Sequence, residues 1–148
     1  MARLRIYDLD EQARALDLRD LLRLLAPRSL QANWAVSPVK SSLAEYAWFE
    51  ATGEGGERLE ALTQDDGRLS GSELAALAED TRQVIWGEFS GSLPAQPGGT
   101  WVVIGAVDST FYAIETDDEA VLSTIGAKYR DVRLGEVPVA AWPLRHPQ

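Results

Sequence analysis

The sequence predicts an α+β fold: a single domain, residues 1–148, with an antiparallel or mixed sheet of about six strands and three helices packed on it. A chain of 148 residues suits one domain. Strand-like segments come in runs and do not alternate with helices, which favours antiparallel pairing. Two apolar runs near the middle of the chain, 82–89 and 101–107, have the length of strands, so we expect them at the centre of the sheet.

The N-terminal residues 1–12 are expected to form a loose arm or an edge strand. Asp17 then looks like the N-cap of a helix, because leucines at 18, 21, 22 and 25 recur with the spacing of one helical face. Pro27 ends this helix, since proline has no amide hydrogen to donate. The alternating segment Gln31–Ser37 predicts a strand with one buried and one wet face.

A hairpin is predicted next. Tyr46–Thr52 is rich in residues that favour strands, the glycines of 53–56 supply a turn, and Arg58–Leu62 is interpreted as the returning strand. Asp65-Asp66-Gly67 marks another turn. Ser70 with Glu73 three residues later is a capping box, which predicts the start of a second helix.

The second half of the chain is expected to continue the sheet. Gln83–Phe89 alternates like a strand, and its Gly87 indicates a bulge or close packing under a neighbouring ring. A Gly/Pro-rich loop, 90–100, leads to Trp101–Val107, whose two apolar faces are typical of a central strand. The remaining predictions are a turn at 108–109, a strand at 110–115, a helix capped by Thr116 and Glu119, a short strand at 131–134 and an irregular tail, 135–148.

Charge and composition exclude several classes of function. The net charge is −9, and residues 43–80 hold ten acidic residues against two arginines, a net −8. Such a surface repels phosphates, so we expect no nucleic-acid partner. The absence of cysteine and the single histidine, His146 in the tail, argue against thiolate, zinc and Ser-His-Asp sites. We therefore expect no metal, no cofactor and no catalytic residue.

No apolar run reaches the length of a membrane span, and the N-terminus has no apolar core of signal-peptide length. These features predict a cytoplasmic protein without a membrane partner. The expected function is a small acidic module that binds a basic protein partner through residues 45–66. The candidate partner-binding residues are Trp48, Glu50, Glu54, Glu57, Asp65 and Asp66. The competing interpretation of the acidity is that it serves solubility alone.

In size, charge and fold class the chain resembles small acidic bacterial immunity and inhibitor proteins, although no matched motif carries the likeness. The resemblance implies a protein that covers the active site of a toxin. One alternative is a small-molecule-binding protein or a carboxylate-based enzyme with a pocket at Asp108, Ser109 and Thr110, covered by the loop 90–99. A homodimer paired through a sheet edge or a helix face is a further possibility.

Overall fold

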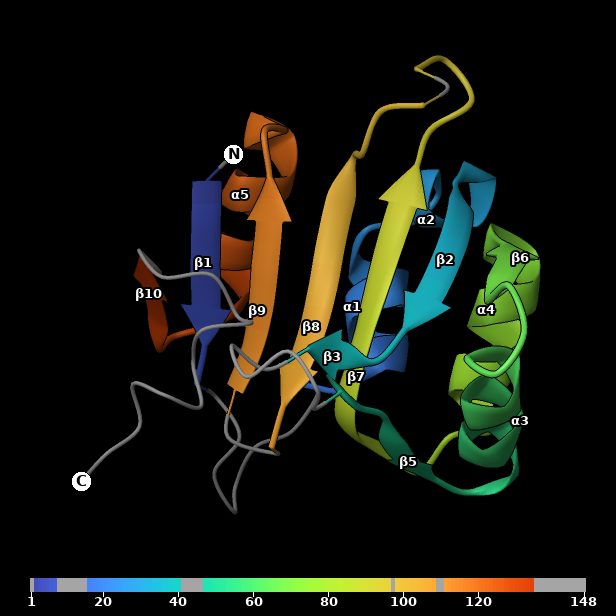
Figure 1. The fold of residues 1–148 in the computed structure, drawn as a ribbon. Coiled ribbons are helices and arrows are strands. Elements are labelled where there is room, and N and C mark those ends of the chain that lie inside the picture. Colours follow the sequence, from blue (N-terminus) through green and yellow to red (C-terminus); the bar gives the residue numbers. More distant parts are fainter. Residues whose placement is uncertain (1, 8–15, 41–46, 97, 109–110, 135–148) are drawn as a thin grey trace.

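The computed structural model describes residues 2–7, 16–40, 47–96, 98–108 and 111–134. Their main feature is one antiparallel sheet of eight strands, in the order β10-β1-β9-β8-β7-β2-β6, with β5 also paired to β7 (Figure 1). Two further short strands, β3 and β4, pair with each other. The described part of the chain also holds five helices. The predicted α+β class is therefore confirmed, with more strands and more helices than expected.

In chain order the elements are β1 (Ala2–Ile6), α1 (Leu18–Leu24), α2 (Arg28–Gln31), β2 (Asn33–Ser37), β3 (Val39–Lys40), β4 (Ala47–Trp48), β5 (Glu50–Thr52), α3 (Glu54–Leu62), β6 (Arg68–Ser70), α4 (Gly71–Glu79), β7 (Gln83–Ser92), β8 (Val102–Val107), β9 (Phe111–Thr116), α5 (Glu119–Lys128) and β10 (Val132–Leu134). No helix in these described segments is long and apolar enough to cross a membrane.

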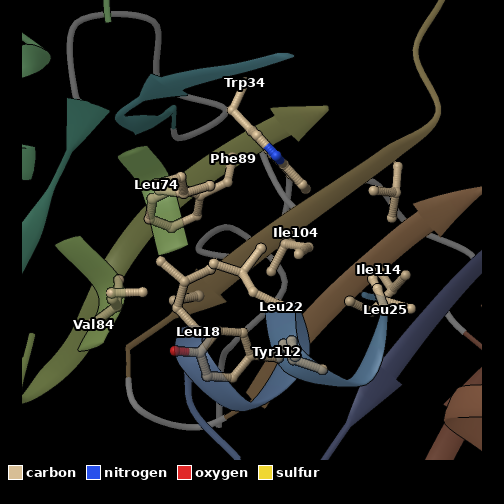
Figure 2. Close-up of a cluster of buried hydrophobic side chains, with 14 of the residues drawn as sticks. Leu18, Leu22, Leu25, Trp34, Leu74, Val84, Phe89, Ile104, Tyr112 and Ile114 are labelled. Carbon is tan, nitrogen blue, oxygen red and sulfur yellow. The ribbon is translucent and has the colours of Figure 1, made fainter. Parts of the chain in front are cut away.

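The two faces of the sheet carry separate apolar clusters. The larger core lies between the strands and the helices, where leucines of α1 and α4 meet Phe89, Ile104 and Ile114 (Figure 2). Side chains alternate along a strand, so Phe111 and Ala113 of β9 face the other way and join Val107 in a smaller buried cluster. In Figure 1 the strand β3 crosses in front of the sheet and α1 and α2 lie behind it.

Strand β8 confirms the predicted centre of the sheet. It pairs with β7 on one side and with β9 on the other, and it is buried along nearly its whole length. The predicted strands at 31–37, 83–89, 110–115 and 131–134 correspond to β2, β7, β9 and β10. Gly87 is packed under a ring as expected, because a Cβ at this position would lie 2.8 Å from Cε2 of Phe49.

Two of the predicted helix starts are confirmed. Asp17 caps α1, and Asp20 completes a capping box there. Ser70 and Glu73 form the predicted capping box of α4. The predicted capping box of Thr116 and Glu119 is wrong. Thr116 is fully buried and its hydroxyl donates to the carbonyl of Trp101, so Asp118 caps α5 instead by accepting from Ala120 N.

The predicted hairpin between Tyr46–Thr52 and Arg58–Leu62 is also wrong. The second segment is the helix α3, and the first contains the two short strands β4 and β5, which pair with different partners. The glycines of 53–56 do not make a hairpin turn. Gly53 has a φ of 92° at the N-cap, and Gly56 lets the first turn of α3 approach Ala51, whose carbonyl carbon would lie 2.7 Å from an added Cβ. Close contact in the folded protein thus outweighs the low helix propensity of glycine.

The N-terminal segment is a strand, one of the two expected alternatives, but it does not lie at an edge of the sheet. Residues 2–6 form β1, which lies inside the sheet between β10 and β9. Residues 1 and 8–12 of that segment and the predicted tail 135–148 lie outside the described residues. Three short elements were not predicted: the four-residue helix α2 after Pro27, the two-residue strand β3 and the three-residue edge strand β6.

Candidate functional site

The acidic segment lies at one end of the sheet, where α3, α4 and β6 stand together at the right of Figure 1. All nine acidic residues described between Ala47 and Asp80 are exposed: Glu50, Glu54, Glu57, Glu60, Asp65, Asp66, Glu73, Glu79 and Asp80. The same stretch contains two basic residues, Arg58 and Arg68, also exposed, so its net charge is −7. Sequence and structure thus place a strongly negative surface here.

Among the described residues, few basic side chains neutralise these acids. Arg23 forms a bidentate ion pair with Glu79, in which Nε donates to Oε2 at 2.8 Å and Nη2 donates to Oε1 at 2.5 Å. Glu79 is the one acid of the segment that pairs with a basic residue in the part of the chain described here. Asp66 and Glu73 accept from backbone amides instead, those of Arg68 and Ser70. Exposed carboxylates without cationic partners are free to meet an external cation.

Four of the six predicted partner-binding residues belong to this surface. Glu54 and Glu57 occupy the first turn of α3, where negative charge is favourable to the helix dipole. Asp65 and Asp66 follow the helix, in the turn before β6, and Glu50 lies in β5, which α3 contacts. The structure therefore places four of the predicted carboxylates on α3 or directly after it, whereas Glu50 is opposite Trp86 in the sheet and shares the face of that ring.

Trp48 does not join them. It is half-buried and stacks on Trp86, with ring centroids 4.8 Å apart and planes tilted by 43°. Trp86 packs against the smaller cluster of Val107, Phe111 and Ala113, on the face of the sheet opposite the helices. By contrast, Leu59 of α3 belongs to the larger core on the helix side. The aromatic ring predicted as an anchor thus lies on the other face from the α3 carboxylates.

A groove runs between α3, α4 and β6. Its volume is about 620 Å³, and its lining residues are Arg58, Ala61, Leu62, Asp65, Arg68, Leu69, Glu73, Ala76 and Leu77. On α3 the contributing positions 58, 61 and 62 have the spacing of one helical face, with 65 in the turn that follows, and on α4 the positions 73, 76 and 77 also share one face. The apolar positions lie between Arg58 and Asp65 on the first segment, and they follow Glu73 on α4. This periodicity is the sequence signal for the groove, but the interpretation of 58–62 as a strand concealed it.

A second hollow lies between α2, the loop that joins β7 to β8, and the start of α5. Arg28, Trp101 and Asp118 form its polar centre, with a volume of about 540 Å³. Trp101 Nε1 donates to Oδ2 of Asp118 at 2.9 Å, and Arg28 Nη2 contacts the same oxygen at 2.5 Å. The guanidinium also lies 5.0 Å from the centre of the Trp101 ring. Sequence reasoning did not single out any of these three residues as a site.

The electrostatics of Asp118 follow from these contacts. Its partial burial acts to raise the pKa, but the hydrogen bonds from Trp101, the amide of Ala120 and Arg28 together outweigh burial, and the pKa is lowered. The side chain is therefore a stable anion that is already engaged by its own neighbours. A ligand in this hollow would compete with them or bind beside them.

The predicted pocket at Asp108–Thr110 is described only in part. Asp108 is exposed and has a positive φ of 53°, whereas Ser109 and Thr110 lie outside the described residues. The loop that was expected to cover this pocket lies at the opposite end of strand β8 from Asp108. Residues 93–100 connect β7 to the start of β8, and Asp108 follows its end, so the length of β8 separates them. The loop instead lines the hollow around Trp101.

Within the described segments, no three side chains of Asp, Glu or His are grouped so as to hold a metal ion. Comparisons with known protein families, with curated proteins and with solved structures find no match for this chain.

Proposed function

We propose that the protein is a binding module whose acidic surface on α3, α4 and the turn before β6 docks a basic protein partner. One observation carries the proposal. All nine acidic residues described between Ala47 and Asp80 are exposed, and a single one of them, Glu79, is paired with a basic side chain in the described structure. Such a concentration of unpaired charge of one sign steers an oppositely charged partner and favours its correct orientation.

The finer role proposed is that of an immunity or inhibitor protein, which covers a basic site on its target. The fold class, the small size and the acidity support this role, and so does the absence of cysteine and of more than one histidine. A protein of this kind acts through the shape and charge of its surface, and it needs no reactive group of its own.

The test compares two variants with the same change in net charge. The first neutralises the proposed surface by Glu54→Gln, Glu57→Gln and Asp65→Asn. The control adds three charges elsewhere, by Gln96→Lys in the β7–β8 loop and by Ser123→Lys and Ala127→Lys on α5, all at exposed positions. Helix α5 lies beside β1 and β9, near the opposite edge of the sheet from α3 (Figure 1).

Each immobilised variant is exposed to an extract of the source cells at low salt, where Debye screening is weakest. We expect at least one basic protein to be retained by the wild type and by the control and to be lost from the neutralised variant. The proposal is overturned if every retained protein stays bound to the neutralised variant as well as to the wild type.

The hollow around Arg28, Trp101 and Asp118 favours a second candidate function, the binding of a small polar molecule. The test is a screen of a fragment library by ligand-observed NMR, with the variant Thr100→Trp as control because it fills the hollow from an exposed position. Fragments that bind the wild type and not this variant support the candidate. An identical set of hits for both proteins contradicts it.

A further inference from the structure

We infer that the groove between α3, α4 and β6 is the place where the partner docks, and that its occupant is an amphipathic helix with an apolar stripe flanked by lysine or arginine. This inference rests on the proposed function and adds the binding mode and the chemistry of the partner. Ala61 and Ala76 are exposed in the groove, and Leu62 and Leu77 are half-buried. These four side chains form an apolar centre between two helices.

The shape of the groove fits a third helix. Its apolar residues come in pairs at adjacent positions, 61 and 62 on α3 and 76 and 77 on α4, with charged residues one turn away on each helix. A helix laid in such a groove presents apolar residues at i, i+3, i+4 and i+7. The buried Leu69 of β6 also contributes to the lining.

The edge of β6 disfavours an extended peptide as the occupant. Successive backbone amides of a strand point to opposite sides, and Leu69 is paired with Trp34 of β2. The amides of Arg68 and Ser70 are already satisfied by side chains, by Oδ1 of Asp66 at 3.0 Å and by Oε1 of Glu73 at 2.8 Å. An added strand would find these donors occupied, so pairing along this edge is opposed.

The charges in and beside the groove determine which kind of partner helix can bind there. Within the groove the charges balance, because Arg58 and Arg68 are matched by Asp65 and Glu73. The excess of negative charge lies beside it on α3, where Glu54 and Glu57 are exposed one turn before Arg58 and Ala61. A partner helix therefore gains by placing apolar residues in the groove and cationic residues over the first turns of α3.

The probes are synthetic helical peptides of about 20 residues, long enough to form a helix in isolation. The first set has a leucine stripe flanked by lysines. The second has the same composition in scrambled order, and the third replaces lysine by glutamate. Two protein variants accompany them: Ala76→Trp, which fills the groove, and Ala127→Trp, the same substitution at an exposed position of α5. Binding is followed by fluorescence anisotropy, and amide chemical shifts locate the peptide.

We expect the leucine–lysine peptides to bind the wild type, with shifts concentrated in residues 58–77. The affinity should fall about tenfold or more in Ala76→Trp and remain within about twofold in Ala127→Trp. If the scrambled peptides bind equally well and Ala76→Trp changes nothing, the groove is not the docking site, although the acidic surface still binds cations. If the glutamate peptides bind as tightly, or no basic peptide binds, the proposed function fails together with this inference.

Discussion

Tyr112 of β9 donates a hydrogen bond from its phenol to Oδ1 of Asp17, 95 residues earlier in the chain, at 2.5 Å. The same oxygen accepts from the amide of Leu18 at 2.9 Å and from the amide of Val84 in β7 at 3.3 Å. One carboxylate thus joins the N-terminus of α1 to two strands of the sheet. This contact orients α1, whose Leu18, Leu21 and Leu22 enter the main core.

The variant Tyr112→Phe is expected to destabilise the protein by about 1–2 kcal/mol, because it removes a hydrogen bond to a charged group while Asp17 keeps its two backbone donors. The matched control is Tyr7→Phe, since no hydrogen bond involves the phenol of Tyr7 in the described structure. Urea unfolding at neutral pH measures both. Equal, small effects of the two substitutions would contradict the role assigned to this contact.

The same residue predicts a dependence on alkaline pH. Burial raises the pKa of Tyr112 well above its usual value of 10.0, and the neighbouring charge of Asp17 adds to the rise. The unfolded chain therefore releases this proton at a lower pH than the folded protein does. Its contribution to stability is complete below about pH 10 and is lost as the pH rises further. Unfolding free energies measured from pH 8 to 11 should fall less steeply in Tyr112→Phe than in the wild type.

Local sequence signals predicted the parts of the fold that depend on neighbouring residues. Asp17 and Ser70 each precede an apolar helical face, and both cap a helix as expected. Thr116 has the same local pattern, yet its hydroxyl is engaged by Trp101, a contact that sequence spacing cannot reveal. The glycines at the start of α3 resemble a turn in the sequence, but Gly53 and Gly55 are required by close contacts with residues 77–82, far away along the chain. Tertiary contact decides such cases.

Alanine substituted at two glycine positions, Gly55 and Gly126, tests whether close packing requires glycine in α3. A Cβ at Gly55 in α3 would lie 2.1 Å from the carbonyl oxygen of Leu77, so Gly55→Ala should destabilise the protein by several kcal/mol, about 2–4. Gly126 in α5 is exposed and has no atom within 4 Å of that point. There alanine should stabilise by about 0.5–1 kcal/mol through helix propensity. Chemical denaturation of both variants gives the comparison, and a stabilising Gly55→Ala would contradict the packing described.

Only part of the candidate site could be predicted from the sequence, as was the case for the fold. The carboxylates around α3 could be proposed from the charge of the segment, because exposed acids are an ordinary consequence of composition. The groove could not be found, since it requires α3 to be a helix packed against α4. Trp48 was expected beside the acids because Glu50 is two residues away, but β4 leaves the main sheet and carries it to the other face.

The contacts of Asp118 predict a loss of stability in acid. Because its pKa is lowered in the folded protein, its contribution is present above the unfolded value of about 4 and is lost as the pH falls through the lower folded value. Asp118→Asn removes this dependence and keeps an oxygen to cap Ala120, whereas Asp118→Ala also loses the cap, at a further cost of about 1 kcal/mol. Thermal unfolding between pH 2 and 6, with the exposed Asp65→Asn as control, measures the difference. Parallel pH profiles of stability for Asp118→Asn and the wild type would contradict the contribution assigned to the Asp118 carboxylate.

We expect the side chains that cover the edge of β6 to suppress self-association of the protein through this edge. Side chains of Asp66 and Glu73 occupy the amides of Arg68 and Ser70, and an edge strand with free donors is a template for pairing with another chain. The double variant Asp66→Ala, Glu73→Ala should therefore raise the average mass in light scattering as the protein concentration increases. Glu57→Ala with Glu60→Ala removes the same two charges from exposed positions of α3 and serves as the control. Circular dichroism checks that α4 survives the loss of its capping box. If both variants associate equally, lower charge repulsion is the cause; if only the first does, the occupied amides of β6 keep this edge from pairing.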